Sequence, residues 1–187
     1  DNELLSVFTD LLEHNDDRIR ANAVEACIPL EFPGKREMFK RMMADNAPRV
    51  CANALLGLWL ADDQQTLSCL YGMLKSDSSK MRASAAYAIS FLAKARRFRR
   101  LFPAYSEQSG LIVLPVIENI LKRLKLMLES SEDSERLQAL RGIGSIGGTD
   151  YREQIDHLLA VETEPEIINL AHTILHDWEH LLRPVKD

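Results

Sequence analysis

A segment of eleven residues recurs along this chain at a fixed interval. Residues 17–27, 48–58 and 79–89 share one pattern, in which Ile19, Val50 and Met81 follow one another at a spacing of 31 residues. Two alanines recur with each of them, two and four positions later (Ala21 and Ala23, Ala52 and Ala54, Ala83 and Ala85). A period in this range is typical of chains in which each repeat buries one face against its neighbours. The interval therefore predicts a repeat array.

Two further copies complete the array. Residues 133–143 place Glu135 at the Ile19 position, and residues 164–175 place Ile167 there. Because Glu135 follows Met81 by 54 residues instead of 31, an insertion of about 23 residues separates the third and fourth copies. We expect repeats at about 3–31, 35–62, 65–95, 115–147 and 151–183, with the insertion at about 96–114. Residues 1–187 are expected to form one domain, a fragment of a larger protein.

Each repeat has the pattern of two antiparallel helices. Apolar residues recur at helical spacing in the first helix, as in Val7, Phe8, Leu11 and Leu12. The second helix carries the small residues, with Gly57 and Gly142 at the Ala26 position. Glycine inside a helix costs roughly 0.5–1 kcal/mol relative to alanine, so we expect a neighbouring helix to approach closely there. No segment has the alternating pattern of a strand.

Polar residues mark the turn between the two helices. Four positions before Ile19 and its equivalents lie Asn15, Asn46, Asp77, Ser131 and Thr163. Their side chains can accept hydrogen bonds from free backbone N–H groups, so we expect them in a turn or at a helix N-cap.

Composition excludes several classes of protein. The chain is 46% hydrophobic and 27% charged, which is typical of a folded domain, and its net charge of −5 disfavours a surface built for nucleic acid. Cys27, Cys51 and Cys69 are odd in number and lack C-x-x-C spacing, which indicates free thiols in a reducing compartment. We expect a cytoplasmic or cytoplasm-facing protein. No apolar run approaches the ~18–20 residues of a membrane span, so no membrane insertion is expected.

The repeats resemble the HEAT-repeat family. The resemblance rests on the polar turn residue, the Val/Ile position and the following Ala-x-Ala, and residues 139–159 are most similar to the short bacterial variety also found in phycobilin lyases. It implies an all-α fold, a right-handed α-α superhelix (solenoid) of about five helix pairs with second helices on the concave side. It also implies a polar ladder of arginines between repeats at the Arg20 and Arg82 position, interrupted where Cys51 and Ile168 stand.

One candidate binding surface is a row of cations. Arg18, Arg49 and Lys80 occupy the position immediately before Ile19, Val50 and Met81. Stacked repeats align equivalent positions, so these residues would form a basic edge for an acidic partner. The alternative is a solvated edge whose cations pair with Asp16, Asp17 and Asp45.

A second candidate is the start of the insertion. Its cations and aromatics, a combination common at interfaces and phosphate sites, are Lys94, Arg96, Arg97, Phe98, Arg99, Arg100 and Phe102. The alternative is an exposed helix end whose cations complement the helix dipole.

A third candidate lies on the last helix. His172, His176 and His180 follow i, i+4, i+8 spacing, and the first two could share a metal ion. The third is ~12 Å further along the helix, and no carboxylate to complete a site is evident. Exposed polar residues are the favoured interpretation, and no cofactor is expected.

Known HEAT-like enzymes differ from this chain. It lacks the His-Glu dipeptides of the di-iron deoxyhypusine hydroxylases, and only residues 94–100 resemble the basic surface of alkylpurine DNA glycosylases. The glycines from Gly142 to Gly148 include G-x-G-x-x-G, but no strand precedes them and helix capping explains them. We therefore expect a non-catalytic protein-interaction scaffold with a protein partner. The alternatives are binding of nucleic acid or a phospho-ligand at the insertion, and an accessory role of the bilin-lyase type.

Overall fold

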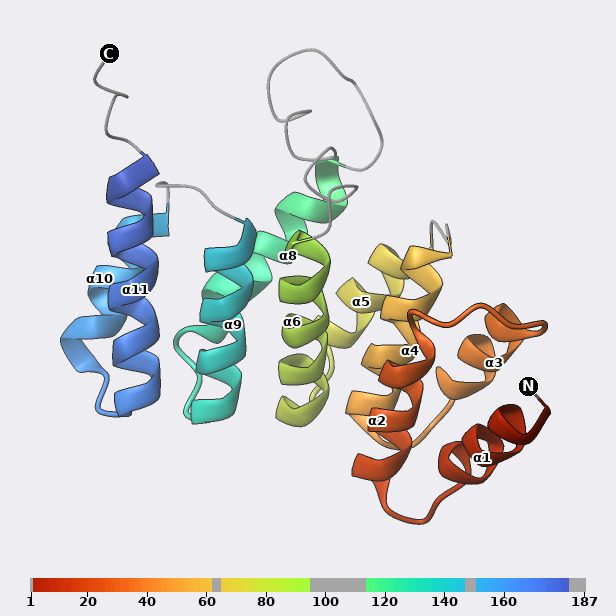
Figure 1. Ribbon diagram of the computed structural model, residues 1–187. Coiled ribbons are helices and arrows are strands. Elements are labelled where there is room, and N and C mark those ends of the chain that lie inside the picture. Colours follow the sequence, from red (N-terminus) through yellow and green to blue (C-terminus); the bar gives the residue numbers. More distant parts are fainter. Residues whose placement is uncertain (1, 62–64, 95–113, 147–150, 182–187) are drawn as a thin grey trace. The chain divides into compact units, whose positions relative to one another are not determined.

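The protein is built from pairs of helices (Figure 1). The computed structural model describes residues 2–61, 65–94, 114–146 and 151–181, and within these ranges the regular structure is helical with no strand. The first helices of the five pairs are α1 (Asn2–Leu12), α3 (Lys35–Met42), α5 (Thr66–Leu74), α8 (Leu114–Met127) and α10 (Arg152–Val161). The second helices are α2 (Asp17–Cys27), α4 (Pro48–Leu60), α6 (Ser79–Lys94), α9 (Asp133–Ile146) and α11 (Pro165–Leu181). The all-α prediction is confirmed for this part of the chain.

The chain divides into two compact units, Asp1–Met73 and Leu74–Asp187. In unit 1, α2 packs against α4, and each also contacts the first helix of its own pair. In unit 2, α6, α9 and α11 lie side by side in one layer, while α8 and α10 form a second layer (Figure 1). None of the described helices combines the length and the apolar character needed to cross a bilayer. The single domain, the right-handed winding and the concave position of the second helices stay predictions.

The core of each unit follows from the apolar stripes of its helices. In unit 1, Val24, Phe39 and Val50 are fully buried in one cluster. Leu124 of α8 and Leu140 of α9 have the same role in unit 2. Since burial of such a side chain contributes roughly 1.5–3 kcal/mol, the helix pairs are held together by contacts with their neighbours more than by helix propensity.

Two glycines allow helices to approach closely. A methyl group at Gly57 would overlap the ring of Phe39, which is fully buried between α3 and α4. A methyl group at Gly142 would lie 3.0 Å from Leu124 Cδ1. The expected close approach at these positions is therefore confirmed.

A side chain in each inter-helix turn accepts a backbone hydrogen bond. In every repeat this acceptor lies five residues before the Ile19 position and binds the N–H two residues after itself. We call these five residues the turn acceptors: His14, Asp45, Ser76, Ser130 and Glu162. The turn acceptor thus lies one residue before the position expected from the sequence.

Candidate protein-interaction surface

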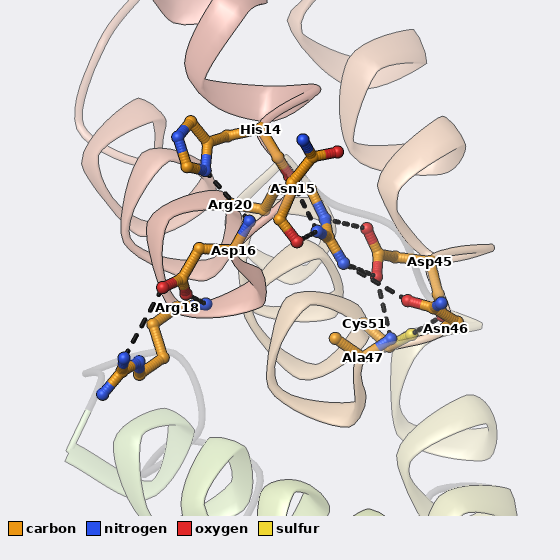
Figure 2. Close-up of polar contacts among 9 residues, drawn as sticks. All are labelled: His14, Asn15, Asp16, Arg18, Arg20, Asp45, Asn46, Ala47 and Cys51. Atoms are coloured by element: carbon orange, nitrogen blue, oxygen red, sulfur yellow. Dashed lines mark hydrogen bonds and ion pairs between the residues drawn. The ribbon is translucent and has the colours of Figure 1, made fainter.

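The loops that join the helices carry an arginine clamp between the first two repeats (Figure 2). Arg20 Nε donates to Asp45 Oδ2 at 2.8 Å, and its Nη2 donates to Asp45 Oδ1 at 2.9 Å. Its Nη1 donates to the carbonyls of His14 and Asn15 at 2.8 and 3.1 Å. The guanidinium therefore closes its own turn with one nitrogen and holds the next repeat with the other two.

The same clamp recurs twice in unit 2. Arg82 donates from Nε and Nη2 to the carboxylate of Glu135, while its Nη1 donates to the carbonyl of Ser76 at 2.8 Å. Arg136 Nε and Nη2 donate to Glu162 at 2.7 and 2.9 Å. We call these three contacts the arginine ladder: Arg20–Asp45, Arg82–Glu135 and Arg136–Glu162.

The carboxylate of the middle ladder contact comes from an unexpected position. Asp45 and Glu162 are turn acceptors, but the turn acceptor of the fourth repeat is Ser130. There the carboxylate is supplied by Glu135, five residues later, and Ser130 Oγ donates to Glu135 Oε2 at 2.7 Å. This side chain is only 1% exposed although it occupies the apolar Ile19 position.

At the position where the arginine ladder was predicted to be interrupted, the thiol of Cys51 replaces one of the hydrogen bonds that an arginine makes. Cys51 Sγ donates to the carbonyl of Asp45 at 2.9 Å, which is the carbonyl equivalent to the one that Arg82 binds through Nη1. The thiol thus provides a hydrogen bond to a carbonyl of its own turn, but it carries no positive charge with which to bind a carboxylate of the next repeat. Burial raises the pKa of this thiol, so it is unsuited to act as a nucleophile.

The ladder carboxylates are held in their charged form. The Arg20 guanidinium lowers the pKa of Asp45, and the Arg136 guanidinium lowers that of Glu162 to about 2. Burial alone would raise the pKa of Glu135, but hydrogen bonds from Arg82 and Ser130 outweigh it and the net change is downward. All five N–H donors of Arg20 are engaged within the described residues, so this arginine has none left for a phosphate. The arginine ladder is therefore structural.

The outward side of the second helices is a different kind of surface. On each of α6, α9 and α11 one stripe has i, i+4, i+7, i+11 spacing, and none of its members is buried. We call this stripe the second-helix face of unit 2: Lys80, Ser84, Tyr87 and Phe91; Ser134, Gln138, Arg141 and Ser145; Glu166, Leu170, Thr173 and Asp177. It is mostly polar, and the phenyl side chain of Phe91 is exposed.

The residues of the predicted cationic row are divided between the two units: Arg18 and Arg49 lie in the first turns of α2 and α4 in unit 1, and Lys80 lies in the first turn of α6 in unit 2. Arg18 is highly exposed and pairs with Asp16 at 3.5 Å, while Arg49 pairs with Glu25 at 3.6 Å. Lys80 is exposed and begins the stripe on α6, and the described residues include no ion-pair partner for it. Pairing with Asp16 is as the solvated-edge alternative expects, whereas Asp45 pairs with Arg20 instead. Binding of an acidic partner at this row stays a prediction.

Within each unit, an ion pair also connects two neighbouring second helices. In unit 1, Arg49 of α4 reaches Glu25 of α2. In unit 2 the signs are reversed, since Glu166 of α11 pairs with Arg141 of α9 at 2.8 Å. Arg49 and Glu166 occupy one repeat position, and so do Glu25 and Arg141. The repeat position of the cationic row is therefore occupied by a cation in the first three repeats and by an anion in the fifth. A comparison of the first three repeats alone does not show this change.

The other two predicted sites are the basic insertion and the histidines of the last helix, and the structure describes only part of them. The basic insertion residues Arg96, Arg97, Phe98, Arg99 and Arg100 lie outside the described residues, as does the side chain of Lys94. His172 and His176 are both exposed on α11, and His176 Nδ1 lies 3.8 Å from Asp177 Oδ1. Among the described residues no three His, Cys, Asp or Glu side chains are grouped so that they could hold a metal ion.

Sequence reasoning missed Glu135 and Glu162 as partners of the arginines. The usable signal is the residue five positions before the Ile19 position, where Asp45 and Glu162 both carry a carboxylate. Glu135 had a second signal, because a charged residue at a position otherwise occupied by Ile, Val or Met requires a buried partner.

The paired helices and the repeated contacts between consecutive pairs define an all-α helical-repeat protein of solenoid-like architecture. Its fold is similar to that of a chain in the CpcE–CpcF complex of phycocyanin lyase from Nostoc sp. PCC7120, with a TM-score of 0.62 and 14% sequence identity over 94% of this chain and 99% of that chain. An engineered protein matches over 94% of this chain and 96% of its own, at 15% identity and a TM-score of 0.42. No protein-family model and no curated protein sequence matches the chain. The likeness to the lyase subunit concerns the fold.

Proposed function

We propose that this chain is a non-catalytic scaffold that binds a protein partner through the second-helix face of unit 2. The observation that carries the proposal is the composition of that face, where exposed Phe91 and half-buried Tyr87 lie among polar side chains. Aromatic residues surrounded by polar groups are typical of protein interfaces, because their rings bury a large area at a small cost in entropy.

The arginine ladder supports this role indirectly. Arg82 and Arg136 fasten the consecutive repeats of unit 2 in place, so the second helices of this unit present their side chains on a rigid support. A preorganised surface loses less conformational entropy on binding than a flexible one. Recognition would then depend on shape and charge, and no chemical step is required of the protein.

A pull-down from the native lysate tests the proposal. The wild-type protein is compared with Phe91→Ser, which removes the exposed aromatic ring, and with Leu126→Ser, which removes an exposed apolar side chain of α8 outside the face. We expect one discrete protein to bind the wild type and the Leu126→Ser variant and to be lost with Phe91→Ser. Circular dichroism checks that both variants remain folded.

Two outcomes would count against this proposal. Equal retention of the partner by both variants would place the contact elsewhere. Recovery of nucleic acid alone, released at moderate salt and lost in an Arg96/Arg97/Arg99/Arg100→Glu variant, would favour the phosphate-binding role predicted for the insertion.

A second candidate function is favoured by the structural likeness. The chain shares its fold with a subunit of the CpcE–CpcF complex of phycocyanin lyase, which supports an accessory role in a heteromeric lyase of that type. Co-elution with phycocyanin in size-exclusion chromatography would support this role. Failure to co-elute, together with a different protein in the pull-down, would leave the scaffold proposal standing alone.

A further inference from the structure

A groove opens on the side of unit 2 formed by the first helices. It has a volume of about 430 Å³ and lies between the end of α8 and the length of α10. Leu128 and Leu158 are almost fully buried at its base, whereas Val161 is 68% exposed. The groove therefore offers an apolar floor with an uncovered apolar edge, where an aliphatic side chain would displace water.

Carboxylates flank this floor. Glu129 and Glu153 both line the groove and are exposed, and the described residues include no ion-pair partner for either of them. The carboxylates of the arginine ladder differ in this respect, because each of them is held by a guanidinium. The charges of Glu129 and Glu153 are thus available to a cation from outside.

The remaining charges near the groove do not cancel this acidity. Lys125 and His157 also line it, but the nearby Arg152 is held by Glu179 at 2.9 Å and by Asp156 at 3.8 Å. By formal charge at pH 7, with histidine counted as neutral, two carboxylates therefore face one lysine. The rim is net negative at neutral pH.

We propose that the groove between α8 and α10 is a docking site for a partner segment in which aliphatic side chains are flanked by lysine or arginine. The aliphatic side chains would cover Leu128, Leu158 and Val161, and the flanking cations would pair with Glu129 and Glu153. Because the groove is flanked by carboxylates, charge complementarity favours a segment with lysine or arginine over an acidic or a wholly apolar segment. The site lies on the first helices and does not depend on the second-helix face.

Nuclear magnetic resonance titration with three short peptides tests the site. The probe is acetyl-Lys-Leu-Leu-Lys-amide; acetyl-Lys-Ser-Ser-Lys-amide lacks its apolar part, and acetyl-Glu-Leu-Leu-Glu-amide reverses its charge. We expect the probe to cause saturable shifts at Leu128, Leu158 and Val161, and the two comparison peptides to bind more weakly.

Variants separate the two contributions to binding. Glu129→Gln with Glu153→Gln should weaken binding of the probe roughly three- to tenfold, as expected for two exposed ion pairs. The control, Glu118→Gln with Glu132→Gln, removes two exposed carboxylates outside the groove and should leave binding unchanged. Val161→Ser should weaken binding without loss of helical circular dichroism.

Three results would overturn the proposal: no groove shifts at millimolar probe, equal binding of all three peptides, or shifts that map to another surface. Because the probe is a defined peptide, each of these results is independent of whether the pull-down recovers a partner on the second-helix face.

Discussion

At the scale of single residues, five different side chains perform one task in the turns. His14, Asp45, Ser76, Ser130 and Glu162 each accept the backbone N–H two residues later. An imidazole nitrogen, a hydroxyl and a carboxylate oxygen can all accept this bond. The turn therefore requires a hydrogen-bond acceptor at this position but not a particular residue type. For this reason the equivalence of the turns is hidden when residue types alone are compared.

The arginine ladder adds a second demand at these positions. At the Arg20 position the second repeat has Cys51, and at the Asp45 position the third repeat has Ser76, so cation and carboxylate are absent together. Loss of only one member leaves a largely buried charge unpaired, which costs more than loss of both. The residues of the ladder should therefore be considered as pairs.

The contact between Arg82 and Glu135 provides a test at this scale. The Glu135 side chain is 1% exposed, so Arg82→Met leaves an unpaired buried carboxylate and should lower the free energy of unfolding by about 3 kcal/mol. Adding Glu135→Leu should recover most of this loss. Urea denaturation measures both variants.

The control for this prediction is Arg152→Met. Arg152 and Glu179 are each nearly half exposed, and such a pair contributes roughly 0–1 kcal/mol. Equal losses for Arg82→Met and Arg152→Met would show that burial does not set the strength of the ladder contacts.

At the scale of helices, the small residues decide how closely each pair can pack. The helical spacing of apolar residues predicts that α3 and α4 exist, and the glycine at the Ala26 position predicts a close approach. Which side chain fills the space above Gly57 could not be predicted, because that depends on the crossing geometry of α3 and α4. The structure places the ring of Phe39 there.

Substitution of Gly57 tests this packing. In Gly57→Ala the new methyl group overlaps Phe39, so we expect a loss of roughly 1–3 kcal/mol despite the better helix propensity of alanine. Gly72→Ala is the matched control, since a methyl group on Gly72 of α5 would meet no neighbouring side chain among the described residues, and it should be neutral or slightly stabilising. Thermal unfolding that ranks the two variants in the opposite order would contradict the packing argument.

At the scale of the whole molecule, carboxylates with lowered pKa values occur in both units. They include the carboxylates of the arginine ladder, Asp45 in unit 1 and Glu135 and Glu162 in unit 2. A folded-state pKa below the unfolded value contributes stability above the unfolded pKa, and this contribution disappears as the pH falls through the folded value. Both units should therefore lose stability in acid.

The loss is largest where the change in pKa is largest. For Glu162, whose pKa falls from 4.5 to about 2, roughly 3 kcal/mol should vanish between about pH 5 and pH 2. Urea midpoints measured over this range should decline steeply for the wild type and less steeply for Glu162→Gln. Parallel curves for the two proteins would show that Glu162 does not contribute to the acid sensitivity.

The period of the array, the helix pairs and the close packing at Gly57 and Gly142 can all be inferred from the amino-acid sequence. These features follow from local rules, because helical periodicity and the size of a side chain act over a few residues. The sequence also indicated an arginine ladder with an interruption at Cys51, through the resemblance of the repeats to a known family.

Which charged side chains form ion pairs depends on the tertiary structure. Arg82 and Glu135 are 53 residues apart in the sequence, with the insertion between them. Arg49 pairs with Glu25 of the preceding repeat. The groove between α8 and α10 likewise combines side chains from two different repeats. Such contacts depend on how consecutive helix pairs stack, and no local pattern in one repeat encodes the position of the next.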